Sequence, residues 1–336
     1  MLRSLYAGIS GMKVNQQKLD IIANNIANVG TTAFKSSRIR FQDMVSQSIS
    51  DASASSINTG GVNGKQIGLG VQVAGIDTMV GQGMMQPTSR TLDVAMDGEG
   101  YLLVAKGAID GKATTDITAG TTTSQTITTN TFNDISYTRD GALTLDDAGH
   151  LLTSDGQRVL GYAIDKSLSY DTSGKLTITF SDANVATTST STTNELIPLT
   201  IPDTMPNKGG TLQRVKTYSI EKDGVIKAVL ADGSVAAVGQ IAMASFKNPA
   251  GLSKIGKNQY ASTSNSGQAV VRSGTGATAD NSKGYGDMLS GMLEMSNVDL
   301  AEQFTDMIVA SRAFQAMGKT ITTGDEILQD IIGLKR

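Results

Sequence analysis

Both ends of the chain carry apolar residues at steps of three and four, and the long region between them does not. The N-terminal stripe comprises Leu2, Leu5, Ile9, Met12, Leu19 and Ile26. The C-terminal stripe comprises Leu300, Phe304, Met307, Phe314, Ile321, Leu328 and Ile332. Because these steps keep side chains on one face of an α-helix, the pattern predicts helices over residues 1–30 and 297–336.

Two arrangements of these helices fit the pattern. In one, each helix packs its stripe on a globular domain of its own chain. In the other, the two helices pair as a coiled coil, and the apolar surface left over is buried between subunits of an assembly. The stripes are wider than a single helix pair covers, which favours the second arrangement. Asn297 is the expected N-cap of the C-terminal helix.

The central region is predicted to consist of β-strands joined by tight turns. Asp-Gly pairs separate the strand-like runs, and residues 218–246 read as a three-stranded meander with two such turns. A content of 37 Gly with only 4% aromatic residues also favours short strands and many turns. Two Thr-rich tracts, residues 114–131 and 186–193, are too polar to build a core. Residues 47–65 are interpreted as a loose linker.

The sequence contains no recognisable catalytic or metal-binding pattern. Its single histidine, His150, lies between turn signals and is interpreted as a surface residue of a hairpin. The acidic cluster from Asp140 to Asp155 lacks the spacing of a calcium-binding loop, and Asp before Gly is common in β-turns. There is no cysteine, hence no thiolate nucleophile. We therefore expect no enzymatic activity, no cofactor and no metal.

Charge and hydropathy exclude two further classes of protein. A net charge of −3 with a pI near 5.3 argues against binding nucleic acid. No apolar run is long enough to cross a bilayer. Polar residues from Lys13 to Asp20 interrupt the N-terminal apolar residues, so no cleavable signal peptide is expected.

Four segments, in order along the chain, resemble the flagellar rod and hook proteins. Residues 22–35, IANNIANVGTTAFK, resemble the N-terminal signature of that family, and residues 297–315, NVDLAEQFTDMIVASRAFQ, resemble its C-terminal signature. Residues 92–104, LDVAMDGEGYLLV, and 137–146, YTRDGALTLD, resemble its core β domain. The signature residues that we single out are Asn24, Asn25, Asn28, Phe34, Lys35, Asn297 and Asp299.

The resemblance implies a fold that is mainly β with α-helical termini. The terminal helices would pair in an inner tube, and residues 31–67 would be a linker. Residues 68–164 and 215–296 would form a discontinuous core β domain, with residues 165–214 as a small inserted outer β domain. Asn24, Asn25 and Asn28 lie beside the apolar stripe and are expected to fix the register between subunits, as polar residues do in coiled coils.

The function that the resemblance implies is mechanical. Residues 68–76, 159–163 and 197–203 are similar to the hook members of the family, which form a curved tube that passes torque from the motor to the filament. The alternative is the distal rod of the basal body, because the inserted segment is short for a hook subunit.

The resemblance also implies partners and a location. The main partner would be the chain itself, in a helical homopolymer. Further partners would be the distal rod protein, the hook cap protein, the hook–filament junction protein and the flagellar export apparatus. The expected location is the extracellular part of the bacterial flagellum, reached by type III export without a cleavable signal peptide.

Overall fold

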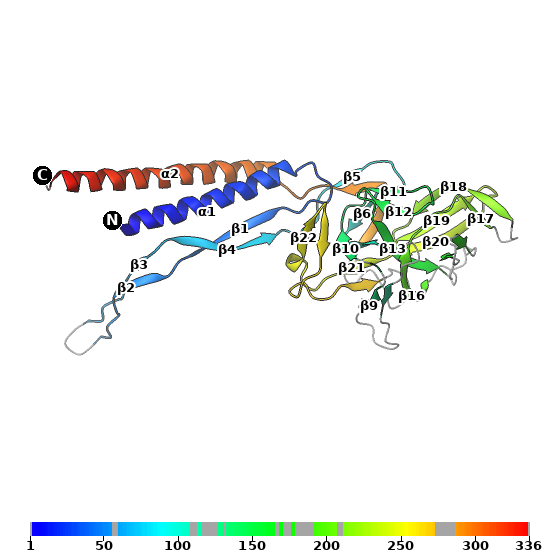
Figure 1. Ribbon diagram of the computed structural model, residues 1–336, viewed down its shortest axis with the longest axis horizontal. Coiled ribbons are helices and arrows are strands. Elements are labelled where there is room, and N and C mark those ends of the chain that lie inside the picture. The colour runs from blue at the N-terminus through cyan, green and yellow to red at the C-terminus, as the bar shows by residue number, and fades with distance from the viewer. Residues whose placement is uncertain are drawn as a thin grey trace. The chain divides into compact units, whose positions relative to one another are not determined.

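The computed structural model describes residues 2–55, 60–107, 113–115, 127–130, 132, 134–164, 168–170, 176–178, 191–206, 211–272 and 286–334. The chain divides into two compact units. The first contains residues 1–30, 35–79 and 297–336, and the second contains residues 31–34 and 80–296. The prediction of a mainly β chain with a helix at each end is confirmed (Figure 1).

The first unit is built around two long helices, α1 (Leu2–Ala27) and α2 (Leu300–Gly333). They pack antiparallel, so that both chain termini lie at the same end of the pair (Figure 1). Glycines allow this close approach: a Cβ atom at Gly11 would lie 3.3 Å from the Met317 side chain, and one at Gly324 would lie 2.8 Å from Leu5.

A long antiparallel ribbon completes the first unit and corrects the prediction of a loose linker. Strand β1 (Ser37–Asp43) pairs with β4 (Val71–Thr78), and β2 (Ser46–Ser50) pairs with β3 (Lys65–Gly68). Both β1 and β4 contact α1. The polar sequence of residues 47–65 gave no strand signal, because β2 and β3 are exposed on both faces and are held by backbone pairing alone.

The second unit contains the remaining strands. In its N-terminal half these are β5 (Met85–Pro87), β6 (Val94–Asp97), β7 (Tyr101–Lys106), β8 (Ala113–Thr115), β9 (Ile127–Asn130), β10 (Asp134–Thr138), β11 (Leu143–Leu145), β12 (Leu151–Thr153), β13 (Arg158–Ile164), β14 (Leu168–Tyr170) and β15 (Leu176–Ile178). In its C-terminal half they are β16 (Ser191–Pro198), β17 (Thr204–Pro206), β18 (Leu212–Ile220), β19 (Val225–Leu230), β20 (Val235–Ile241), β21 (Met243–Ser245), β22 (Ser253–Gly256), β23 (Gln259–Ala261), β24 (Val270–Arg272), β25 (Asp287–Ser290) and β26 (Met292–Glu294).

One large antiparallel sheet organises this unit, with neighbouring strands in the order β17-β18-β19-β20-β13-β7-β10-β23-β22. The predicted meander is confirmed as β18, β19 and β20. Its two turns contain Gly224 and Gly233 at φ values of +76° and +84°, which favour glycine. Strand β7 is buried on both faces, with Leu102 in one core cluster and Leu103 in the other, which explains its unbroken apolar sequence.

The predicted outer insert, residues 165–214, belongs to the second unit. Within the part of the chain that the structure describes, β14 and β15 pair only with each other, whereas β16 pairs with β13 and β8 in the large sheet. Most of the Thr-rich tract at 114–131 and residues 186–190 of the second tract lie outside the described residues. The boundaries of an outer domain therefore stay a prediction.

His150 is buried, so its interpretation as a surface residue was wrong. The residue is 3% exposed, and its Nδ1 atom lies 2.9 Å from the hydroxyl of Thr200. The residues adjacent to His150 in sequence suggested an exposed hairpin, but Thr200 comes from a distant segment that bridges to it and covers it. Burial lowers the pKa of His150, the nearby Asp146 opposes this shift, and Arg158 adds to it.

This burial predicts a pH dependence of folding. Because the pKa of His150 is lower in the folded chain than its ordinary value of 6.5, the unfolded chain binds more protons between those two values. The free energy of unfolding should therefore decrease as the pH falls below about 6.5. Urea unfolding at pH 5, 6 and 7 measures this loss, which should be smaller in His150→Gln. An equal loss in both proteins would contradict the assignment.

Candidate assembly surface

The contact between α1 and α2 uses only part of the apolar surface of each helix. The most buried apolar residues of the two helices are Val14, Ile22 and Ala310, with exposed fractions of 6%, 3% and 1%. None of these three belongs to the predicted stripes. The stripe residues that are half-buried are Leu5, Met12, Leu19, Ile26, Met307, Phe314, Ile321 and Leu328. Leu2, the remaining N-terminal stripe residue besides Ile9, is not among the residues whose side chains are described.

The other stripe residues are exposed, together with apolar residues that the stripe analysis missed. Ile9 is 52% exposed and Phe304 is 50% exposed. We use the term exposed helical surface for Tyr6, Ile9, Leu300, Phe304, Ile308, Val309, Ile327, Ile331, Ile332 and Leu334. Large apolar side chains left uncovered in such number indicate a contact with another protein surface. The spacing of three and four residues predicted one apolar stripe per helix and left out exposed apolar residues beside it, such as Ile308 and Ile331.

The ribbon of the first unit also exposes apolar side chains. They are Phe41, Met44, Val45, Ile49, Val62, Ile67, Leu69, Ile76 and Met79. The alternation of residue types in β1 and β4 was the available sequence signal for this ribbon. The first unit therefore exposes apolar side chains both on its helices and on its ribbon.

Asn25 joins the end of α1 to the start of β1 and to α2. It is 2% exposed, and its amide group donates to the Ser37 carbonyl oxygen at 2.9 Å and to the Gln303 side chain at 3.0 Å. Its own side-chain oxygen accepts from the Ser37 N–H at 3.0 Å. Asn25 thus pairs with the backbone of β1 as a neighbouring strand would. These bonds lie within one chain, so a role of Asn25 in register between subunits stays a prediction.

Asn297 makes a similar connection at the same end of the ribbon. Its side-chain oxygen accepts from the Ser36 N–H at 2.8 Å, and its amide donates to the Met79 carbonyl oxygen at 2.7 Å. The expectation that Asn297 caps α2 was therefore wrong. The N-cap is Asp299, whose carboxylate accepts from the Ala301 N–H at 2.8 Å.

The remaining signature residues have local partners or are buried. Asn28 donates to the backbone and side-chain oxygens of Asn24, at 2.9 and 2.7 Å, in the last turn of α1. Lys35 is 1% exposed. The ring of Phe34 lies 4.9 Å from the Lys254 Nζ atom, which is a cation–π distance. Within the described residues, the signatures therefore serve to connect segments of the chain.

Two kinds of feature, a metal site and a membrane-spanning helix, are absent from the described residues. Across them, no three His, Cys, Asp or Glu side chains are grouped so as to hold a metal ion. No helix among them has the length and apolar character that crossing a membrane requires. The feature of the described residues that suggests a function is the exposed apolar surface of the helices and the ribbon.

Family models of flagellar proteins match three parts of the chain. Residues 5–35 match "Flagella basal body rod protein", and residues 289–334 match "Flagellar basal body rod FlgEFG protein C-terminal". Residues 126–228 match "Flagellar hook protein FlgE/F/G D1 domain". The two terminal matches cover most of the helices, and the central match includes β10, β13 and β18 of the large sheet.

Known proteins are similar over the whole length. The chain is 40% identical to the flagellar basal-body rod protein FlgG of Bacillus subtilis, with 100% of both chains covered. It is 33% identical to the flagellar hook protein FlgE of Borreliella burgdorferi and 32% identical to FlgG of the same organism, again with full coverage. A solved structure of the Helicobacter pylori hook protein FlgE2 aligns with a TM-score of 0.41 at 11% identity, covering 62% of this chain and 100% of that one, which is too weak to carry an argument.

Subunits of this family polymerise into the axial structure of the flagellum, and the family is a structural one. The terminal helices with uncovered apolar faces suit that role. This chain belongs to the family of flagellar rod and hook proteins.

Proposed function

We propose that the chain is the subunit of the flagellar hook, a flexible tube that transmits motor torque to the filament. The observation that carries the proposal is the exposed helical surface. Each subunit pairs its own two helices and still leaves residues such as Phe304 and Ile331 about half exposed. Burying these side chains between neighbouring subunits would produce a continuous, tightly packed inner tube.

A hook must also bend while it rotates, which requires outer contacts that exchange easily. Strand β18 presents polar side chains to solvent, among them Arg214, Lys216 and Ser219, which are exposed. Polar contacts in water are individually weak and replaceable. A tube with an apolar inner wall and polar outer contacts can therefore change curvature without losing its continuity.

Local sequence favours the hook over the rod. Three segments similar to hook proteins lie in ordered elements: residues 68–76 lead into β4, residues 159–163 lie in β13, and residues 197–203 follow from β16. Overall identity does not separate the two, because the hook and rod proteins of Borreliella burgdorferi are 33% and 32% identical to this chain.

One observation favours the distal rod as the alternative. The alignment with the Bacillus subtilis rod protein spans 339 positions, against the 336 residues of this chain. The alignment with the Borreliella burgdorferi hook protein spans 473 positions, so that hook protein has a large segment without counterpart here. In length, the chain is closer to what a rod subunit requires.

The remaining parts of the proposal concern location and partners. We propose that the subunit acts outside the cell, after passage through the type III export apparatus of the flagellum. Its neighbours along the axis would be the distal rod protein, the hook cap protein and the hook–filament junction protein. The absence of cysteine from the whole sequence suits a chain that is exported unfolded, because no disulfide can form beforehand.

Electron microscopy of the purified chain, polymerised in vitro, tests the proposal. A hook subunit should form curved tubes, because the outer contacts permit subunits to adopt different spacings on the two sides of a bend. Straight, stiff tubes would overturn the hook in favour of the distal rod. Failure of the folded protein to form any tube would contradict a self-assembling subunit of either kind.

A further inference from the structure

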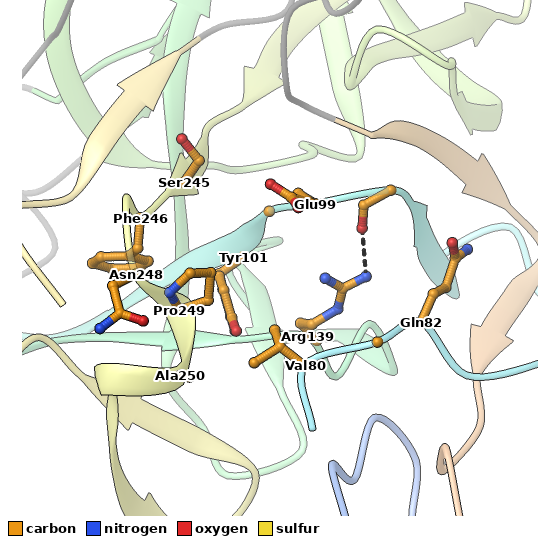
Figure 2. A pocket seen from close by; sticks show the side chains of 13 residues that line it. Val80, Gln82, Glu99, Tyr101, Arg139, Ser245, Phe246, Asn248, Pro249 and Ala250 are labelled. Atoms are coloured by element: carbon orange, nitrogen blue, oxygen red, sulfur yellow. Dashed lines mark hydrogen bonds between the residues drawn. The ribbon is translucent and has the colours of Figure 1, made fainter. Parts of the chain in front are cut away.

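The second unit contains a pocket at the meeting point of the two internal segments that resemble the family. Its volume is about 430 Å³, and residues of both segments line it: Glu99 and Tyr101 from the first, Arg139 from the second. The other side is formed by Phe246 and Pro249, which follow β21. Figure 2 shows Tyr101, Phe246 and Pro249 grouped together, with Arg139 and Val80 beside them.

Arg139 is the most constrained of these side chains. It is 3% exposed, and its Nε atom donates to the Glu294 carboxylate at 2.8 Å. Its Nη2 atom donates to the Gly98 carbonyl oxygen at 2.8 Å, drawn as a dashed line in Figure 2. Its Nη1 atom has no hydrogen bond to any described residue, although the side chain borders the pocket. This Nη1 donor is available to an acceptor that enters the pocket.

The other walls define what else an occupant must supply. Tyr101 and Phe246 form an edge-to-face pair with ring centroids 5.8 Å apart, which gives the pocket an apolar floor. Glu99 is exposed at the rim, while the charge of Arg139 is already balanced by Glu294. The site therefore favours a segment with one apolar side chain, a carbonyl oxygen and a cation, and it disfavours an anion.

Strand β18 of the same unit presents these groups. Leu212, at its start, is 73% exposed. Arg214 follows two residues later on the same face of the strand, and the exposed Lys216 lies at the β-bulge between Val215 and Thr217. Both cations are exposed, and neither has an ion pair or hydrogen bond from its side chain to the described residues.

We propose that the pocket at Arg139 binds the start of β18 from a second copy of this chain. Leu212 would rest on Tyr101 and Phe246, a carbonyl oxygen beside it would accept from the Nη1 atom of Arg139, and the cations of β18 would face Glu99. Charge complementarity between the two surfaces is the argument for this occupant.

This contact joins two different surfaces, so each copy offers one pocket and one strand. A contact of that kind repeats from copy to copy and builds an open helical array instead of a closed dimer. The inference rests on the proposed function, because it assigns one of the outer contacts within the polymer. The proposed contact would fix how the second units of neighbouring copies align, in addition to the apolar packing of the helices.

A charge exchange in the full chain tests the proposal. Glu99→Lys alone, and Arg214→Glu with Lys216→Glu, should each raise the critical concentration for tube formation about tenfold. The chain that carries all three changes should return to near the wild-type value, because every interface then regains opposite charges. Sedimentation of polymer from monomer measures the critical concentration, and circular dichroism verifies folding.

Matched controls place the same charge changes elsewhere on the unit. Lys222→Glu and Asp147→Lys alter exposed residues outside the pocket and outside β18, and they should leave the critical concentration unchanged. Leu212→Asp provides a second test, and it should impair tube formation without altering the unfolding transition.

Two outcomes would overturn the proposal. If β18 variants polymerise as the wild type does, β18 is not the occupant. If Glu99→Lys impairs polymerisation and the triple variant does not restore it, another partner fills the pocket. Failure of the wild-type chain to form tubes would instead count against the proposed function, so the two failures are distinguishable.

Discussion

Ile9→Asp is expected to abolish tube formation and to leave the unfolding transition of the monomer unchanged. Ile9 is 52% exposed in the monomer, so a carboxylate there remains hydrated and costs little. If neighbouring subunits cover this position in the polymer, the same carboxylate becomes buried without a partner. That burial costs about 3 kcal/mol or more in every subunit. Phe304→Asp should have the same effect, because Phe304 is 50% exposed.

The experiment compares sedimentation and electron microscopy of the variants with far-ultraviolet circular dichroism of the monomers. Gln17→Asp is the matched control, since it introduces a carboxylate at an exposed polar position of the same helix. Val14→Asp is the opposite control, because Val14 is 6% exposed and its replacement should destabilise the first unit of the monomer. Tubes of normal length from Ile9→Asp would show that the exposed helical surface is not the contact between subunits.

Glu294→Ala is expected to destabilise the second unit by about 3–5 kcal/mol. The Arg139–Glu294 ion pair is almost completely buried, with side-chain exposures of 2% and 0%. Removing the carboxylate leaves the guanidinium charge buried without a counter-ion. It also removes the acceptor for the Gly83 N–H, which donates to Glu294 Oε1 at 2.9 Å. Few single substitutions in this unit should cost more.

Urea unfolding followed by circular dichroism measures this loss. Glu221→Ala is the control within the same unit, because Glu221 forms a more exposed ion pair with Lys227, and such pairs contribute at most about 1 kcal/mol. The double variant Arg139→Met with Glu294→Leu should recover much of the stability, since apolar residues replace both charges. If Glu294→Ala and Glu221→Ala destabilise equally, the buried pair does not stabilise the fold as expected.

Sequence alone determined the class of the fold and the family. Helical periodicity predicted both terminal helices, because a repeat of three and four residues is a local property that survives without knowledge of partners. The meander of β18, β19 and β20 was equally accessible, since Asp-Gly turns require the positive φ that glycine adopts at Gly224 and Gly233.

Which helix face is buried was decided by tertiary structure. The stripe through Leu2, Leu5, Ile9 and Met12 is as regular as the face that contains Val14 and Ile22, yet Val14 and Ile22 are buried and Ile9 is 52% exposed. Periodicity predicts that a helix has an apolar face. The segments that pack against the helix decide which of its residues are buried. Small residues such as Gly11 then let the helices approach closely.

The ribbon and the polar contacts also depended on long-range pairing. Strands β2 and β3 have no buried face, so their pattern carries no signal, and only their mutual pairing defines them. His150 and Glu294 acquired their buried partners, Thr200 and Arg139, from segments distant in sequence. Local sequence specifies a residue's own conformational preference and charge, but burial depends on which distant segment folds over it, and only the tertiary structure contains that information.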